Sequence, residues 1–269
     1  FALLLLLPPL VCLYRHDRRK SPRVKTQSTS NPFSSSAYKR VLITGGTGFI
    51  GEAVINQLLD AGHTVSVLAR DPLKAANLFD GRVRSVQSLS ELSHDEAFDV
   101  VINLAGAPVA GPRWSPKRQA QLIASRVNTT EALMTWLKNT KHKPALWIQA
   151  SAIGFYGVRD ASESLDEHAS KGDGFMAELC SRWEAAAQPA TEFGVRQVVL
   201  RLGVVFGAGG ALTPLLMPFR LGFGGRMGDG RQIMSWVHRD DVIQVIARSC
   251  DDNHLSGTYN LVAPDAVSQ

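Results

Sequence analysis

Three glycines in the stretch LITGGTGFIG constrain the fold of this chain more than any other feature. Gly45, Gly48 and Gly51 follow a short β-branched run and lead into residues 49–61, whose apolar residues have helical spacing. In such a turn the first glycine permits a tight bend, the second lets a phosphate approach the backbone, and the third lets the helix pack close to the strand. Free amides at the start of the helix favour an anion. The spacing therefore predicts a strand–turn–helix unit that binds a dinucleotide.

Strand-like and helix-like segments alternate along the rest of the chain, as is typical of a parallel sheet covered by helices on both faces. Ser115 followed by Pro116 is a typical helix start. We expect an α/β fold, a Rossmann-type doubly wound parallel sheet, over residues 40–269, with a small substrate-binding lobe around 207–236. Because the chain stops just after a strand-like segment, we expect it to be truncated at the C-terminus. The expected strands are 40–46, 64–70, 99–106, 145–152 and 196–207, and the expected helices are 49–61, 114–139 and 174–193.

Residues 1–39 form a tail whose composition differs from that of the body. The tail opens with an apolar stretch of 14 residues that contains two prolines, which is short of the roughly 20 residues of a membrane span. Basic residues follow it, and then a stretch rich in Ser and Thr. Because the chain does not begin with Met, we interpret residues 1–20 either as the remnant of a membrane tether or as part of a targeting segment, and residues 21–39 as a linker. A disordered leader without function is the third interpretation.

Charge is divided unevenly between the tail and the body. Residues 1–40 hold eight Lys or Arg and one acid, whereas the rest of the chain holds 21 Lys or Arg and 23 acids. A body without net positive charge is not typical of a nucleic-acid-binding domain, so we expect no nucleic-acid partner. Cys12, Cys180 and Cys250 are too few and too far apart to predict a disulfide framework or a metal site. They indicate a reducing compartment, either the cytoplasm or an organelle stroma.

The end of the second predicted strand indicates which dinucleotide is bound. An acid at this position would bind the ribose hydroxyls of NAD, but the chain has Arg70 there. A guanidinium suits the 2′-phosphate of NADP(H), so the sequence favours NADP(H) as the cofactor. Small residues in the segment NLAG, residues 103–106, would let the adenosine side of the cofactor lie against the backbone.

The stretches TGGTGFIG, NLAG and SAIGFYG resemble the extended branch of the short-chain dehydrogenase/reductases. FMAELCSRWEAAA, RLGVVFGAGGAL and SWVHRDDV narrow the resemblance to an epimerase-like subgroup of NAD(P)-dependent sugar-nucleotide epimerases, some of whose plastid members are named cell-division-inhibitor-like. The resemblance covers about residues 40–265. It implies a cofactor site made of a glycine loop, a 2′-phosphate residue and an adenosine-side wall: Gly45, Gly46, Thr47, Gly48, Phe49, Ile50, Gly51, Arg70, Leu104, Ala105 and Gly106.

The acid–base pair that the family would supply is missing. The helix expected to carry Tyr-x-x-x-Lys has Phe175 and Leu179 at those positions, and neither side chain can relay a proton. Ser151 corresponds only approximately to the catalytic Ser or Thr of the family, because a shifted alignment places Ala152 there. For the two other candidates the alternative is a packed, hydrogen-bonded structural side chain. The candidate catalytic residues are Ser151, Tyr156 and His238.

Several arginines near the Gly-rich segments suit a diphosphate or carboxylate ligand, although they would equally suit a solvated loop. Arg201 and Asp240 are interpreted as a structural charge pair or as loop anchors. Two functions stay open: an NADP(H)-dependent, epimerase-like oxidoreductase with altered acid–base residues, or an inactive NADP(H)-bound scaffold or redox sensor, which the resemblance links to cell or organelle division. The candidate substrate-binding residues are Arg113, Trp114, Arg220, Arg226 and Arg231.

Overall fold

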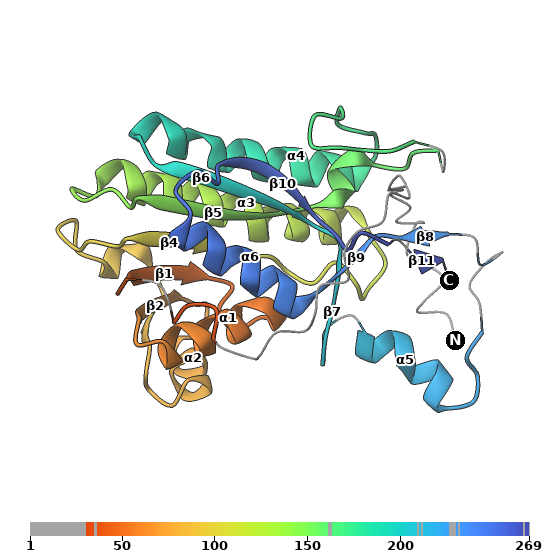
Figure 1. Ribbon diagram of the computed structural model, residues 1–269, viewed down its shortest axis with the longest axis horizontal. Helices are drawn as coiled ribbons and strands as arrows, with labels where there is room; N and C mark the ends of the chain where they lie inside the picture. The colour runs from red at the N-terminus through yellow and green to blue at the C-terminus, as the bar shows by residue number, and fades with distance from the viewer. Residues whose placement is uncertain are drawn as a thin grey trace.

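A seven-stranded parallel sheet forms the centre of the protein, in the strand order β10-β6-β5-β4-β1-β2-β3 (Figure 1). The computed structural model describes residues 31–34, 37–160, 163–208, 210, 212–225, 230, 232–265 and 267–268. The order reverses between β1 and β4, so the predicted Rossmann-type doubly wound sheet is confirmed. The strands are β1 Arg40–Thr44, β2 Thr64–Leu68, β3 Arg84–Val86, β4 Val100–Asn103, β5 Leu146–Ala152, β6 Arg196–Leu202 and β10 Gly257–Leu261.

Helices cover both faces of this sheet because its strands are apolar on both sides. Val41 and Ile43 of β1 pack into a cluster with α1, α2 and α6, whereas Leu42 between them packs with α3 and with the segment after α4. The helices are α1 Phe49–Asp60, α2 Pro72–Leu78, α3 Pro116–Asn139, α4 Phe175–Ala187, α5 Leu212–Arg220 and α6 Arg239–Asp251, with the short 3₁₀ helices η1 Leu89–Glu91, η2 Ile153–Tyr156 and η3 Gln188–Phe193.

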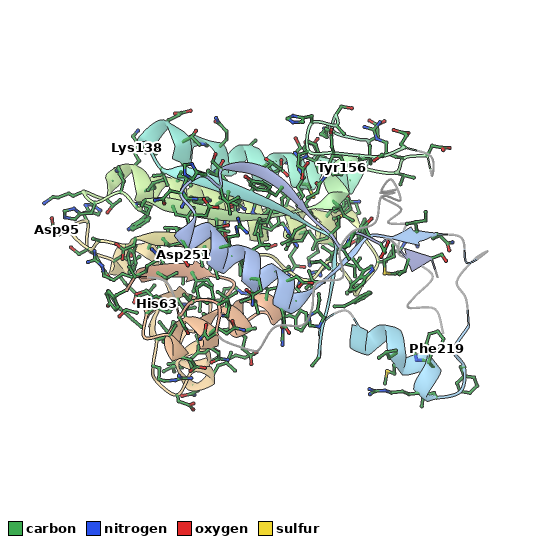
Figure 2. All side chains as sticks on the ribbon, viewed as in Figure 1. His63, Asp95, Lys138, Tyr156, Phe219 and Asp251 are labelled. Carbon is green, nitrogen blue, oxygen red and sulfur yellow. The ribbon has the colours of Figure 1, made fainter. Side chains whose placement is uncertain are left out.

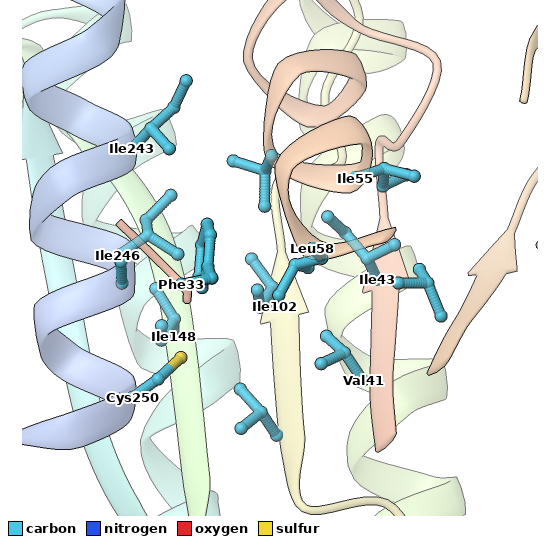
Figure 3. Packing of buried hydrophobic residues seen from close by; sticks show 14 of the residues in the cluster. Phe33, Val41, Ile43, Ile55, Leu58, Ile102, Ile148, Ile243, Ile246 and Cys250 are labelled. Atoms are coloured by element: carbon cyan, nitrogen blue, oxygen red, sulfur yellow. The ribbon is translucent and has the colours of Figure 1, made fainter. Parts of the chain in front are cut away.

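The folded domain starts earlier than predicted. Residue 40 was the expected boundary, but Phe33 is 1% exposed and lies in the core beside Ile148 and Ile246 (Figure 3). Asn31 fixes this segment to the body by donating its side-chain amide to the carbonyl of Gln57 at 2.7 Å. A single aromatic residue in a polar, Ser-rich stretch gives no periodic signal, which is why the sequence alone classed the segment as a linker. Residues 1–30, and with them the predicted tether, lie outside the described residues.

Two predicted elements are each divided in the structure. The expected strand 196–207 breaks at Gly203, where an added Cβ would lie 2.8 Å from the carbonyl oxygen of Ser235. The chain then leaves the main sheet as β7 Val204–Phe206, which pairs with β9 Trp236–His238. The expected helix 174–193 likewise continues after Ala187 as η3. By contrast, the predicted cap of α3 is confirmed, because Ser115 accepts a hydrogen bond from the amide of Arg118.

The predicted lobe contains the short helix α5, which Figure 1 shows standing away from the sheet. Phe219, labelled in Figure 2, is 60% exposed, and Met217, Leu221 and Phe223 are more than 60% exposed. Strand β8 Ile233–Met234, near the end of this region, pairs with β11 Val267–Ser268. Among the helices that the structure describes, none has both the length and the apolar character needed to cross a bilayer.

Candidate functional site

The glycine loop after β1 is forced by close backbone contacts. Gly45 has φ of +69°, and an added Cβ would lie 2.4 Å from the carbonyl oxygen of Leu104. At Gly51, in the first turn of α1, an added Cβ would lie 2.3 Å from the carbonyl oxygen of Gly45. The helix, the loop and the segment after β4 therefore approach one another more closely than any side chain permits. The backbone reasons predicted for Gly45 and Gly51 are thereby confirmed, whereas the close approach of a phosphate at Gly48 stays a prediction.

The start of α1 leaves its backbone donors without partners. Gly48 is the N-cap and has no side chain to accept a hydrogen bond. The first-turn amides of Phe49, Ile50 and Gly51 have no acceptor among the residues that the structure describes. Together with the helix dipole, these amides make the turn suited to an anion such as a phosphate.

Arg70 lies two residues after the end of β2 and is exposed. The acid next to it, Asp71, already accepts a hydrogen bond from the amide of Lys74 at 2.9 Å as the N-cap of α2. Within the described part of the chain, no hydrogen bond or ion pair engages the Arg70 guanidinium. Its charge is therefore available to a ligand at this edge of the sheet.

A buried amide that sequence reasoning did not select fixes the segment after β4. The Asn103 side chain accepts a hydrogen bond from Thr44 Oγ1 at 2.6 Å and donates to Thr130 Oγ1 at 2.8 Å and to Gln149 Oε1 at 2.9 Å. All four residues are 1% exposed or less. The network joins β1, β4, β5 and α3 at Asn103, the residue directly before the predicted adenosine-side wall, Leu104–Gly106. The detectable signal was a polar residue ending an otherwise apolar strand.

The residues of α4 that face the end of β5 lie one position later in the chain than the sequence predicts. A Cβ added to Gly154 of η2 would lie 3.2 Å from Met176 Cε and 3.6 Å from Cys180 Sγ. Positions 176 and 180, rather than Phe175 and Leu179, thus face the end of β5. Met176 cannot exchange a proton, and burial raises the pKa of the Cys180 thiol to about 12. The corrected register therefore still provides no Tyr–Lys pair.

Ser151 lies at the end of β5, but its hydroxyl is bonded to the protein interior. Ser151 Oγ donates to Glu184 Oε1 at 2.5 Å. The same carboxylate binds Arg201 through two hydrogen bonds of 2.9 Å. The side chain of Glu184 is 15% exposed and that of Arg201 is 6% exposed. Arg201 is thus a structural residue as predicted, but its partner is Glu184 and not Asp240. A fork-to-fork pair of this kind holds the serine hydroxyl in one orientation.

Tyr156 is labelled in Figure 2 and continues the same buried network. Its hydroxyl donates to Asn260 Oδ1 at 2.7 Å and accepts from Arg201 Nη1 at 2.8 Å. The side chain is 1% exposed, and burial raises the pKa of the phenol although Arg201 opposes the shift. The hydroxyl thus has protein partners on both sides and couples η2 to the edge strand β10.

His238 does not join Ser151 and Tyr156 in the described structure. Its ring is the N-cap of α6, where Nδ1 accepts from the amide of Asp240 at 3.3 Å, and its side chain is 45% exposed. Of the candidate catalytic residues, Ser151 and Tyr156 therefore belong to one closed hydrogen-bond network, whereas His238 is a half-exposed helix cap.

Of the five predicted substrate-binding residues, the structure describes three, two before the start of α3 and one on α5. Trp114 packs edge-to-face on Phe175, with ring centroids 5.4 Å apart, while Arg113 beside it is exposed. Arg220 is exposed in the last turn of α5. Arg226 and Arg231 lie outside the described residues. In the part of the chain that the structure describes, no group of three or more His, Cys, Asp or Glu side chains is placed to hold a metal.

A parallel sheet with this glycine loop defines a Rossmann-type dinucleotide-binding domain. The chain belongs to the NAD dependent epimerase/dehydratase family, whose model matches residues 41–261. The resemblance to the extended short-chain dehydrogenase/reductases and their epimerase-like subgroup is thereby confirmed.

Two relatives and one solved structure illustrate the match. The mouse epimerase family protein SDR39U1 is 40% identical over 235 residues, which cover 85% of this chain and 76% of the mouse protein. The chloroplastic SDR39U1 homologue of Arabidopsis thaliana is 32% identical over 234 residues, covering 84% of this chain and 67% of the relative. The crystal structure of human SDR39U1 (isoform 2) with NADPH has a TM-score of 0.74 and 33% identity, and covers 85% of this chain and 76% of the human chain.

Proposed function

We propose that the chain is an NADP(H)-binding, epimerase-like oxidoreductase that works without the Tyr-x-x-x-Lys pair. The observation that carries the proposal is the glycine loop, in which backbone contacts leave no room for side chains at Gly45 and Gly51 while the amides at the start of α1 have no acceptor among the described residues. Such a loop has the shape and the donors that a pyrophosphate requires. The human relative that was crystallised with NADPH supports the same cofactor.

Arg70 supports NADP(H) over NAD(H). A 2′-phosphate carries charge that a guanidinium can bind through two hydrogen bonds, whereas ribose hydroxyls are better met by a carboxylate. In this chain the position after β2 offers a free guanidinium, and the adjacent carboxylate of Asp71 is already bonded as a helix cap. The charge arrangement is thus favourable for the phosphorylated dinucleotide and unfavourable for its unphosphorylated counterpart.

The chain's own residues would bind and orient the cofactor rather than relay a proton. When bound, NADP(H) supplies the hydride chemistry of the site. Asn103 and its partners hold the segment after β4 in place, and the pair of Glu184 and Arg201 holds the end of β5 against α4. Ser151 and Tyr156 remain candidates for a polar contact to a substrate, but each would first have to exchange an existing hydrogen bond.

The closed network at β5 supports a second candidate function. A protein that binds NADP(H) without turnover needs the glycine loop but no free acid or base, and the hydroxyls of Ser151 and Tyr156 are both committed to protein partners. Such a protein would act as a scaffold or redox sensor, with partner binding that differs between NADPH and NADP⁺. The organelle location of the Arabidopsis relative motivates testing partners in a stromal fraction as well as in cytoplasm.

Isotope exchange tests the proposal and separates the two candidates. The chain would be incubated with NADPH deuterated at C4 and with a panel of aldehydes, ketones and nucleotide-linked sugars, and mass spectrometry would follow transfer of deuterium. Gly48→Asp is the matched control, because it places a carboxylate where the first-turn amides favour an anion.

The oxidoreductase predicts deuterium transfer to at least one substrate class, abolished by Gly48→Asp. Tight NADPH binding without transfer to any member of the panel favours the scaffold instead. A folded chain that binds no NADPH contradicts both.

A further inference from the structure

One buried cation beside the predicted adenosine-side wall has no carboxylate partner among the described residues. Arg126 of α3 is 8% exposed, and its guanidinium donates to the carbonyls of Leu122 and Ala107 at 3.2 and 3.1 Å and lies 3.4 Å from Ser125 Oγ. These three acceptors are neutral. Among the described residues no ion pair engages Arg126, and burial lowers the pKa of its guanidinium. A charge buried without a counter-ion is costly, so its retention at one position calls for a physical reason.

The contrast with Arg201 shows that the fold can neutralise a buried arginine. Arg201 is 5% exposed and is paired with Glu184 through both of its carboxylate oxygens. Around Arg126 the chain supplies the opposite environment. Residues 100–130 contain four Lys or Arg and no acid. The segment from β4 through the first half of α3 therefore contributes no carboxylate that could offset the charge of Arg126.

The position of Arg126 places this charge against the predicted cofactor wall. A Cβ added to Gly106 would lie 2.8 Å from the guanidinium carbon and 2.9 Å from Nη2, so the group lies directly against the backbone of that glycine. Its other side faces the ring of Trp183, with the guanidinium 5.1 Å from the ring centroid. Trp183 lies one turn after Cys180 on α4. In the corrected register, Cys180 stands at the position where the family resemblance implies a lysine. The indole Nε1 of Trp183 also has no acceptor among the described residues.

We propose that Arg126 binds an anionic oxygen, of a phosphate or a carboxylate, in the ligand held at Gly106, and thereby supplies from α3 the fixed positive charge that α4 lacks. The inference rests on the proposed function for the identity of the main ligand. Two sources would provide the same chemistry: the pyrophosphate of the dinucleotide, or an acidic group of the substrate. A guanidinium held on one side by an aromatic ring and on the other by backbone is already oriented to bind such an oxygen.

The test compares Arg126→Met and Arg126→Lys with the parent chain, with Arg182→Met as the control. Arg182 is exposed on α4, which packs against α3, so its replacement removes the same charge from a neighbouring helix without removing a contact that the structure gives for Arg126. NADPH affinity is measured by fluorescence titration in the absence of substrate. Binding of UDP-glucuronic acid, an anionic nucleotide sugar, is measured on the NADPH-loaded chain. Thermal melting without ligand verifies that each variant is folded.

If the anion belongs to the cofactor, Arg126→Met weakens NADPH binding by about ten- to a hundredfold, as expected for loss of a charge-assisted hydrogen bond. Arg126→Lys retains part of the affinity, and Arg182→Met binds as the parent does. If the anion belongs to the substrate, NADPH affinity is unchanged and binding of UDP-glucuronic acid falls by a similar factor. Folded Arg126 variants that stay within twofold of the parent for both ligands overturn the proposal.

Inorganic pyrophosphate separates failure of this inference from failure of the proposed function. If the parent chain binds no NADPH, the proposed function fails. A rise in melting temperature with pyrophosphate that is present in the parent and lost in both Arg126→Met and Gly48→Asp would still support an anion site that includes Arg126. The absence of any pyrophosphate effect in a chain that also fails to bind NADPH overturns the inference as well.

Discussion

The β1–α1 and β5–α4 regions of the molecule satisfy their polar groups in opposite ways. At the β1–α1 end, the first-turn amides and the Arg70 guanidinium have no partner among the described residues. At the β5–α4 end, Ser151, Glu184, Arg201 and Tyr156 bond to one another. Unpaired polar groups are usually costly, so the first region is organised for a ligand, whereas these four side chains of the second region satisfy one another without one. The difference favours cofactor binding at the β1–α1 end and a structural role for the four side chains at the β5–α4 end.

The largest expected effect comes from breaking the closed network. Glu184→Gln leaves Arg201 buried without a counter-charge, and loss of one partner of a buried ion pair costs about 3–5 kcal/mol of folding stability. Chemical denaturation would measure the loss. Glu178→Gln is the matched control: Glu178 is an exposed residue of the same helix, paired with Lys171, and its replacement should have a far smaller effect. Because Glu184 stabilises the β5 end only, NADPH affinity of folded Glu184→Gln should change little; a large loss would contradict the separation of the two regions.

Gly51→Ala tests the opposite end. The new Cβ would lie 2.3 Å from the carbonyl oxygen of Gly45, so α1 must shift away from the loop. We expect a stability loss of about 1–3 kcal/mol, as for overpacking, together with loss of most NADPH affinity, because the loop and the amides move apart. Gly225→Ala is the control, since an added Cβ meets nothing within 4 Å there. Denaturation and fluorescence titration give the two readouts, and unchanged NADPH affinity would show that the loop does not hold the cofactor.

Tyr156→Phe removes the phenol oxygen between Arg201 and Asn260 and keeps the ring. Loss of one buried hydroxyl from a satisfied network should cost about 1–3 kcal/mol of stability. If the network is purely structural, the stability of the variant falls and any deuterium transfer persists. Loss of transfer at unchanged stability would instead make Tyr156 a catalytic residue.

The smallest expected effect concerns the titration and the reactivity of the two buried thiols. Burial raises the pKa of both Cys180 and Cys250 from the reference value of 9.0 to about 12. A raised pKa favours the protonated thiol in the folded state, so this stabilisation is complete below about pH 9 and decreases as the pH rises toward 12. In a chain carrying Cys12→Ser, we expect no reaction with a thiol reagent at pH 8 until the protein unfolds. Fast labelling of the native protein would show that the side of α4 or α6 that carries the labelled cysteine is open to solvent.

The sequence predicts the β1–α1 end well because its determinants are local. A strand, a glycine turn and a helix start lie within about a dozen residues, and the structure confirms the backbone reasons predicted for Gly45 and Gly51. The β5–α4 end depends on partners distant in the chain. Glu184 is 17 residues from Arg201, and Tyr156 is 104 residues from Asn260. No periodic pattern reveals such pairs, which explains why Arg201 was assigned the wrong partner.

The start of α4 illustrates a subtler limit. Gly174, with φ of +92°, is the N-cap, and the rotation of the helix that follows decides which residues face β5. An error of one residue turns a helix by about 100°, which is enough to exchange Phe175 for Met176. Phe33 shows the same limit for packing, since one aromatic residue outside any pattern fills a place in the core.

Binding of NADP(H) by the glycine loop and Arg70 is the property on which the proposed function depends. Fluorescence titration of the intact chain with NADPH and with NADH, repeated for Arg70→Asp, tests it most directly. We predict that the parent binds NADPH roughly tenfold or more tightly than NADH, and that Arg70→Asp removes this preference without lowering the melting temperature. Equal affinity of the parent for both dinucleotides, or no binding by a folded chain, would contradict this mode of binding.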